Sequence, residues 1–163
     1  MFKKGDFVVN ANNGICEITD RTFEKVSGQE KEYYVIVPLQ EPTVKVYISV
    51  DSAENKMRLA MSKNEAWDII KSIKTVEETY VENEKERERI FREALASRDP
   101  KRLVSIIKTI YLRRQKRQEE GKKSTALDER YFKQAESHLH SELAFALGVD
   151  LLEITRIIAS QME

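Results

Sequence analysis

Lys3-Lys4-Gly5-Asp6-Phe7-Val8-Val9 opens the stretch of sequence that decides the fold. Four runs rich in β-branched and aromatic residues follow one another along it: Phe7–Val9, Ile15–Phe23, Tyr33–Leu39 and Thr43–Val50. Turn-forming residues separate these runs at Asn12-Asn13-Gly14, Ser27-Gly28 and Glu41-Pro42. Strands this short must curl into a barrel to bury a core, because an isolated hairpin is only marginally stable. The sequence therefore predicts a small β-barrel, and a barrel without pocket-building insertions is typical of a docking surface.

The composition suits one domain or two small ones, since 163 residues include 40% hydrophobic and 34% charged residues. The formal net charge is zero, but the charges are unevenly distributed. Residues 101–123 carry nine cations against two glutamates, whereas residues 77–93 carry seven glutamates against four cations. A neutral chain with one strongly basic block indicates a localised electrostatic footprint.

The sequence disfavours several classes of protein. A single cysteine, Cys16, excludes an intramolecular disulfide, and its place in a hydrophobic strand predicts a core residue. We expect a cytoplasmic protein without a membrane role, because neither a signal peptide nor a spanning apolar run is present. His138 and His140 are two residues apart, which puts them on different faces of a helix. Since phosphate-binding and nucleophile motifs are also missing, the sequence predicts no cofactor, no metal and no enzymatic activity.

Beyond a short strand predicted at 57–60, the chain indicates a series of helices. Ser62 and Glu65 form a capping box for a helix that runs to about Ile73, and Trp67 on or beside its apolar stripe is expected to pack in the core. A polar connector over 74–81 leads to a helix over 83–96. The later helices are predicted from their caps: Asp99 before Pro100–Gln118, Thr125 with Asp128 before a long helix that Gly148 ends, and Asp150 before the last one.

The helix from Pro100 to Gln118 changes character along one face. That face begins with four apolar residues: Leu103, Ile106, Ile107 and Ile110. The helical period places Arg114 and Arg117 on the same stripe. Because buried arginines without partners are unfavourable, we expect this helix end to protrude beyond the core. A cationic helix end and loop can neutralise phosphates with little regard to base sequence; the alternative is a solubilising surface.

Taken in order, these residues resemble the bacterial CarD/CdnL family of RNA polymerase-binding transcription regulators. The opening Phe2-Lys3-Lys4-Gly5-Asp6-Phe7-Val8-Val9 is similar to the family pattern F-x-x-G-D-x-V-V. Other elements that are similar follow in sequence: Gly14, Ile18–Thr22, Gln29–Tyr33, Thr43–Val46, Leu95–Asp99, Leu112-Arg113-Arg114, and Ala135 with Glu142-Leu143-Ala144. The resemblance covers about residues 1–150.

The resemblance implies an α+β protein, with a small N-terminal Tudor-like β-barrel followed by an all-helical C-terminal domain. It implies that residues 1–60 dock on the RNA polymerase β subunit through Arg21 and Lys45. It implies that residues 61–163 contact promoter DNA beside the melted region, mainly through phosphate and minor-groove contacts. The positions that it assigns to DNA are Asn83, Glu84, Arg87, Arg113, Arg114, Lys116, Arg117, Lys122 and Lys123.

Two positions depart from the family pattern. Asn10-Ala11 replaces a common Tyr-Pro before the first turn, which affects loop stiffness. Glu84 stands where many members carry a tryptophan that wedges into the minor groove, and Trp67 lies elsewhere. Glu84 therefore argues against a wedge mechanism in this chain.

Together these features predict a monomeric transcription regulator, cytoplasmic and associated with the nucleoid through RNA polymerase, that modulates open-complex stability. One alternative is a protein–protein adapter whose basic helical block binds an acidic partner and not DNA. An enzyme is a second alternative, disfavoured because no acid, base or metal set converges.

Overall fold

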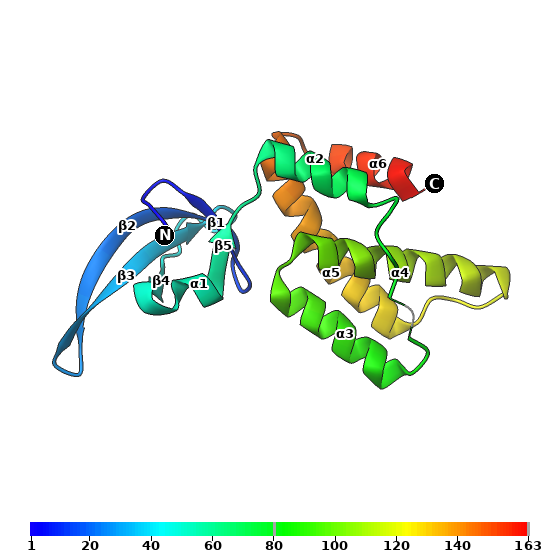
Figure 1. Ribbon diagram of the computed structural model, residues 1–163, viewed down its shortest axis with the longest axis horizontal. Helices are drawn as coiled ribbons and strands as arrows, with labels where there is room; N and C mark the ends of the chain where they lie inside the picture. Colours follow the sequence, from blue (N-terminus) through cyan, green and yellow to red (C-terminus); the bar gives the residue numbers. More distant parts are fainter. Residues whose placement is uncertain (80, 163) are drawn as a thin grey trace. The chain divides into compact units, whose positions relative to one another are not determined.

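The computed structural model describes residues 1–79 and 81–162 and divides the chain into two compact units, Met1–Ala60 and Met61–Glu163 (Figure 1). Tyr80, within the predicted connector, and Glu163, at the end of the predicted helical domain, lie outside the described residues. The fold class is α+β, because one unit is built on an antiparallel sheet and the other on helices.

The first unit contains a five-stranded antiparallel sheet with the order β4-β3-β2-β1-β5. Its strands are β1 (Phe7–Asn10), β2 (Gly14–Val26), β3 (Gln29–Pro38), β4 (Val46–Ser49) and β5 (Met57–Leu59). All five predicted runs contain a strand, but β4 begins at Val46 rather than at Thr43. Lys45 therefore directly precedes β4 instead of lying within it.

The predicted closed barrel is not confirmed, because the sheet remains open between its edge strands β4 and β5. A 3-10 turn η1 (Val50–Ser52) and a short helix α1 (Ala53–Lys56) connect these two strands. Ala53 and Phe2 are buried in the same core cluster as Ile18 and Ile36 of the central strands. The helical turn and the phenyl ring of Phe2 thus cover the end of the core. Water is excluded there without pairing between β4 and β5.

Alternation along the strands determines which side chains enter this core. Cys16 and Ile18 on β2, and Tyr34 and Ile36 on β3, have almost no exposed surface. The prediction that Cys16 is a core residue is confirmed, and burial raises the pKa of its thiol to about 11. The register of β2 with β3 shifts between Ile18 and Asp20, and the two strands then stay paired as far as Val26 and Gln29.

The second unit is helical. Its helices are α2 (Lys63–Ser72), α3 (Glu84–Ser97), α4 (Pro100–Glu119), α5 (Ala126–Leu147) and α6 (Leu151–Met162). Among the described residues, none of these helices is both long enough and apolar enough to cross a membrane. The capping box of Ser62 and Glu65 is confirmed, and Asp99 caps α4 by accepting a hydrogen bond from the Lys101 N–H.

The core of this unit is formed by apolar stripes from all five helices. Its largest fully buried side chains are Ile70, Ile73, Phe91, Ile106, Ile107, Ile110, Leu139, Leu143 and Ile154. Trp67 lies beside the buried stripe of α2 with 39% of its surface exposed, which corrects the expectation that it packs in the core. The first turns of α3 and α5 and the second half of α4 meet at Asp128, while α4 extends further (Figure 1).

Candidate functional site

Arg21 and Lys45 occupy different environments on the sheet. Arg21 lies on β2 opposite Tyr34, in the same row as Ile48, and its guanidinium carbon is 5.3 Å from the centroid of the Tyr34 ring. It also forms an ion pair with Glu32 on the neighbouring strand. Lys45 is exposed next to Val46, which packs against the core. Arg21 thus covers a buried tyrosine, whereas Lys45 presents a solvated cation.

The outer edge of β4 is a feature that the sequence reasoning missed. Among the described strands, β4 pairs only with β3, so one side of its backbone carries N–H and C=O groups available for pairing. Tyr47 on this strand is 52% exposed, and Val44 just before it is also exposed. Run length did not signal this edge in the sequence, because Thr43–Val50 is longer than Phe7–Val9, which contains the interior strand β1.

In the helical unit, Asp128 binds two of the arginines that the family resemblance assigns to DNA. Its Oδ1 accepts a hydrogen bond from Arg87 Nε at 3.2 Å, and its Oδ2 accepts one from Arg113 Nε at 2.9 Å. The Asp128 side chain is 1% exposed and that of Arg87 is 6% exposed. Arg87 Nη1 also donates to the carbonyl oxygens of Val81 and Glu82. Asp128 therefore ties α3, α4, α5 and the segment before α3 together.

This use of Asp128 alters the predicted capping box at the start of α5. Thr125 caps the helix as predicted, since its hydroxyl accepts a hydrogen bond from the Asp128 N–H at 3.1 Å. The Asp128 carboxylate, which would complete the box, instead binds Arg87 and Arg113. In the sequence, Asp128 was interpreted as part of a capping box. Its role as the partner of two distant arginines was therefore not predicted.

Arg114 is paired with the next residue on α5, Glu129. Arg114 Nε donates to Glu129 Oε1 at 3.0 Å, and Arg114 Nη2 donates to Glu129 Oε2 at 3.1 Å. The guanidinium carbon also lies 4.4 Å from the centroid of the Phe132 ring. The premise that Arg114 lacks a partner is wrong, since α5 supplies both a carboxylate and an aromatic face. The last residue of α4 that is buried is Ile110, so the helix beyond it does not lie within the core.

The remaining predicted cations form what we call the basic corner: Lys116, Arg117, Lys122 and Lys123. Lys116, Lys122 and Lys123 are exposed, and Arg117 is half-buried. Arg117 Nε donates to the Lys123 carbonyl oxygen at 2.8 Å, which folds the loop back on the helix. Lys122 Nζ lies 3.6 Å from a carboxylate oxygen of Glu120. The ammonium groups of this corner lie on the surface, where an anionic partner can reach them.

Asn83 and Glu84 begin α3 at the same end of the unit. Asn83 is the N-cap, and its side-chain oxygen accepts a hydrogen bond from the Glu86 N–H at 3.0 Å. Glu84 is exposed in the first turn, where a carboxylate interacts favourably with the positive end of the helix dipole. A local structural reason therefore accounts for both residues.

His140 and Glu142 are buried titratable residues on α5. Glu142 Oε2 accepts a hydrogen bond from the Met61 N–H at 2.8 Å. His140 Nε2 is buried without a hydrogen-bond partner, and burial lowers the pKa of this imidazole to about 4. Within residues 1–79 and 81–162, no group of three or more His, Cys, Asp or Glu side chains could hold a metal ion.

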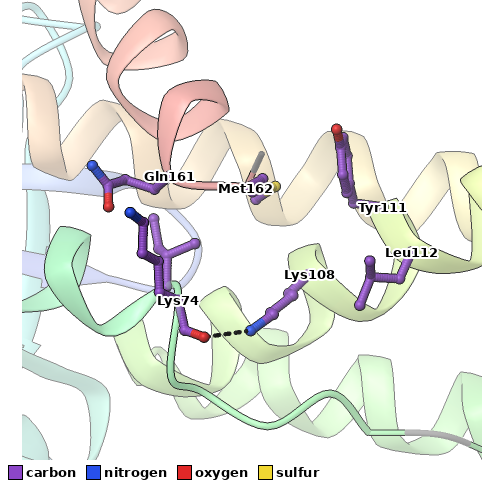
Figure 2. Close-up of a pocket in the computed structure, with 7 residues that line it drawn as sticks. Lys74, Lys108, Tyr111, Leu112, Gln161 and Met162 are labelled. Carbon is purple, nitrogen blue, oxygen red and sulfur yellow. Dashed lines mark hydrogen bonds between the residues drawn. The ribbon is translucent and has the colours of Figure 1, made fainter.

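A pocket of about 150 Å³ lies between the end of α2, α4 and the end of α6 (Figure 2). Its polar lining includes Lys74, Lys108 and Tyr111, beside the apolar Leu112 and Met162. Lys108 Nζ donates to the carbonyl oxygens of Lys74 at 3.2 Å and Val76 at 2.9 Å. The Lys108 ammonium group thus holds the segment that follows α2 against α4. This structural role accounts for the presence of a lysine in the pocket.

Comparison with known families assigns the sheet unit. Residues 2–61 match the CarD-like/TRCF RID domain over the whole of the five-stranded sheet. This segment is similar to the RID domains of CarD-like and TRCF proteins. A domain of this family interacts with the RNA polymerase β subunit. Comparison of the chain with curated proteins gave no match.

The CarD-like RID domain confirms the predicted family for the first sixty residues or so and makes this unit a protein-binding module of transcription. Arg21, Lys45 and the β4 edge all belong to it. The helical unit begins where the matched segment ends, so its cations belong to a part of the chain that the family assignment does not cover.

Proposed function

We propose that this chain is a transcription regulator that docks on the RNA polymerase β subunit and contacts promoter DNA, thereby modulating open-complex stability. The observation that carries the proposal is the CarD-like RID domain at residues 2–61. In this proposal the protein acts in the cytoplasm, on the nucleoid, as a binding protein and not as an enzyme. The helical unit supplies the DNA contact, and the sheet unit supplies the polymerase contact in the form of a Tudor-like docking module.

The β4 edge is the part of the RID domain that best suits docking. An edge strand can accept an extended segment of a partner through main-chain hydrogen bonds, with specificity coming from neighbouring side chains. Tyr47 is an exposed aromatic residue on this strand, and Lys45 adds a solvated cation beside it. Exposed tyrosines are enriched at binding hot spots, and a charged side chain on the rim of an interface affects the rate of association and its specificity. Arg21 supports this region indirectly, through its contacts with Tyr34 and Glu32.

The basic corner is the proposed DNA-contacting surface. Lysine and arginine side chains on a helix end and loop neutralise phosphates and release counterions, which gives salt-dependent and sequence-tolerant binding. Arg87 and Arg113 are left out of this surface, because breaking their pairing with buried Asp128 would leave a buried charge uncompensated. The contact therefore depends on fewer cations than the sequence of residues 101–123 suggests.

The first turn of α3, whose Arg87 binds Asp128 at the start of α5, presents Glu84 instead of an apolar wedge. A carboxylate in a minor groove meets negative potential and adds no stacking contact. We therefore propose that this chain holds DNA through phosphates and stabilises open complexes less than regulators that insert a tryptophan.

Polymerase docking is tested with the full chain and the core enzyme. We expect Lys45→Glu to reduce co-purification strongly, since like-charge contacts across an interface cost several kcal/mol. Lys4→Glu is the matched control, because Lys4 is exposed in the same unit near β1, which β2 and β3 separate from β4. Equal retention of both variants would refute the assignment of docking to the β4 edge.

DNA contact is tested by titrating the full chain with a duplex at several salt concentrations. About three to five phosphate contacts give a log–log slope of roughly −3 to −5. The double change Lys122→Ala with Lys123→Ala should reduce that slope by about 2, whereas Lys101→Ala with Arg102→Ala, two exposed cations at the other end of α4, should not. A chain that binds polymerase but shows no salt-dependent DNA binding is the adapter instead.

A further inference from the structure

Arg114 lies between two groups that orient its guanidinium. The Phe132 ring covers one side at 4.4 Å, and the Glu129 carboxylate accepts two hydrogen bonds, at 3.0 and 3.1 Å, from the edge. Both charged side chains remain in contact with water, since 34% of the Arg114 side chain and 46% of the Glu129 side chain are exposed. The Arg114 guanidinium is therefore held in one orientation although it is accessible to solvent.

The neighbouring pair on the same two helices provides the contrast. Arg113 is bound to Asp128, whose carboxylate is 1% exposed and also binds Arg87. Separating Arg113 from Asp128 would require a partner that enters the interior. Separating Arg114 from Glu129 requires only rotation of a half-exposed glutamate side chain, and an ion pair in contact with water is easier to separate than a buried one. Consecutive arginines therefore differ in whether their carboxylate partner can be exchanged.

A phosphate group has the chemistry to make this exchange. It presents two oxygens to a guanidinium with the same forked geometry as a carboxylate, and the arginine side chain is suited to such bidentate contacts. Stacking on Phe132 keeps the Arg114 guanidinium oriented while the anion changes, so that less conformational freedom is lost on binding. The edge of Arg114 that holds Glu129 is thus a preformed position for a phosphate.

We infer that Glu129 is an internal competitor for phosphate: it occupies the binding edge of Arg114, and a DNA phosphate gains this arginine only by displacing it. The inference rests on the proposed DNA contact and adds Arg114 to the basic corner as an exchangeable member. Glu129 thereby limits affinity for DNA, and sets how many phosphates the helical unit neutralises.

Removal of the competitor should strengthen DNA binding by the full chain. We expect Glu129→Gln to tighten binding about 2- to 5-fold at moderate salt, because the exchange no longer breaks an ion pair of this weak class. The salt slope should become steeper by about 0.9, the value of one additional phosphate contact. Glu119→Gln is the matched control, since it removes one exposed negative charge from the end of α4 itself.

A double-mutant cycle then tests whether Glu129 acts through Arg114. In an Arg114→Ala background, Glu129→Gln should no longer steepen the slope, because the position that it frees is gone. An equal response to Glu129→Gln and Glu119→Gln, or a Glu129→Gln effect that persists without Arg114, would overturn the inference. Absence of salt-dependent binding by the wild-type chain would instead refute the proposed DNA contact, so the two failures are distinguishable.

Discussion

The two units keep polar groups in their interiors in different ways. The buried polar side chain of the sheet unit is Asn10, whose amide serves a turn and the chain beside it. The helical unit buries Arg87, Asp128 and His140, which include charges and a titratable ring. The stability of an apolar core does not change with pH. The stability of a core with buried charges depends on each group that is paired with those charges. This difference predicts that the free energy of unfolding of the helical unit depends more strongly on pH and on single buried side chains than that of the sheet unit.

The largest effect is expected from Asp128→Asn. Loss of this carboxylate leaves the buried Arg87 guanidinium and its neighbour Arg113 without their anion. Breaking a buried pair in this way costs about 3–5 kcal/mol in free energy of unfolding. Urea unfolding followed by the fluorescence of Trp67, the single tryptophan, reports this loss in the helical unit.

Asp51→Asn is the control, because Asp51 is an exposed residue of the sheet unit. Amide hydrogen exchange of β2 and β3 should remain unchanged in both variants. A change in Asp128→Asn as small as that in Asp51→Asn would remove the contrast between the two interiors.

The next effect is a dependence of stability on pH that comes from His140. Burial lowers the pKa of His140 from 6.5 to about 4, so the unfolded chain takes up the proton first as the pH falls. Stability is therefore complete above pH 6.5 and is lost progressively between pH 6.5 and 4, by up to about 3 kcal/mol. His140→Phe, an apolar replacement, should remove this component.

The measurement is the urea midpoint of the helical unit at pH 7.5 and at pH 4.5 in both proteins. Carboxylates titrate in the same range, so the quantity compared is the difference between the two pH responses. Identical responses in wild type and His140→Phe would show that the imidazole is solvated in the native state.

The smallest effect is expected in the sheet unit, from Asn10→Ala. The Asn10 amide donates to the Lys56 carbonyl oxygen at 3.0 Å, and its oxygen accepts from the Asn12 N–H at 3.1 Å. The exposed turn can satisfy its own groups with water, so the loss should be about 1 kcal/mol and independent of pH. Hydrogen exchange of β1 and β5 measures it; a loss as large as that in Asp128→Asn would contradict the comparison.

Local signals in the sequence predicted most of the elements. The five strand-forming runs and the caps at Ser62, Asp99 and Thr125 were confirmed because each depends on residues within a few positions. Closure of the barrel was not confirmed, because η1 and α1 cover the core where a strand pairing was expected. The segment formed by η1 and α1, residues 50–56, is too short for a helical period of apolar residues to mark it in the sequence.

The candidate site was harder to predict than the fold. The count of cations in residues 101–123 treats each arginine as free, but Arg113 and Arg114 find their carboxylates fifteen positions away on α5. Arg87 and Asp128 are forty-one positions apart. Pairings at these separations depend on how the helices pack, which a charge pattern along the chain does not contain.

The open edge of β4 also has a consequence for aggregation. A strand with an unpaired side can template pairing with another extended chain, including a second copy of itself. Two features oppose such growth here: β4 has only four residues, and Lys45 places a charge at its entrance. Lys45 is thus positioned as a gatekeeper against self-association of the sheet, and a neutral residue there would favour edge-to-edge strand pairing.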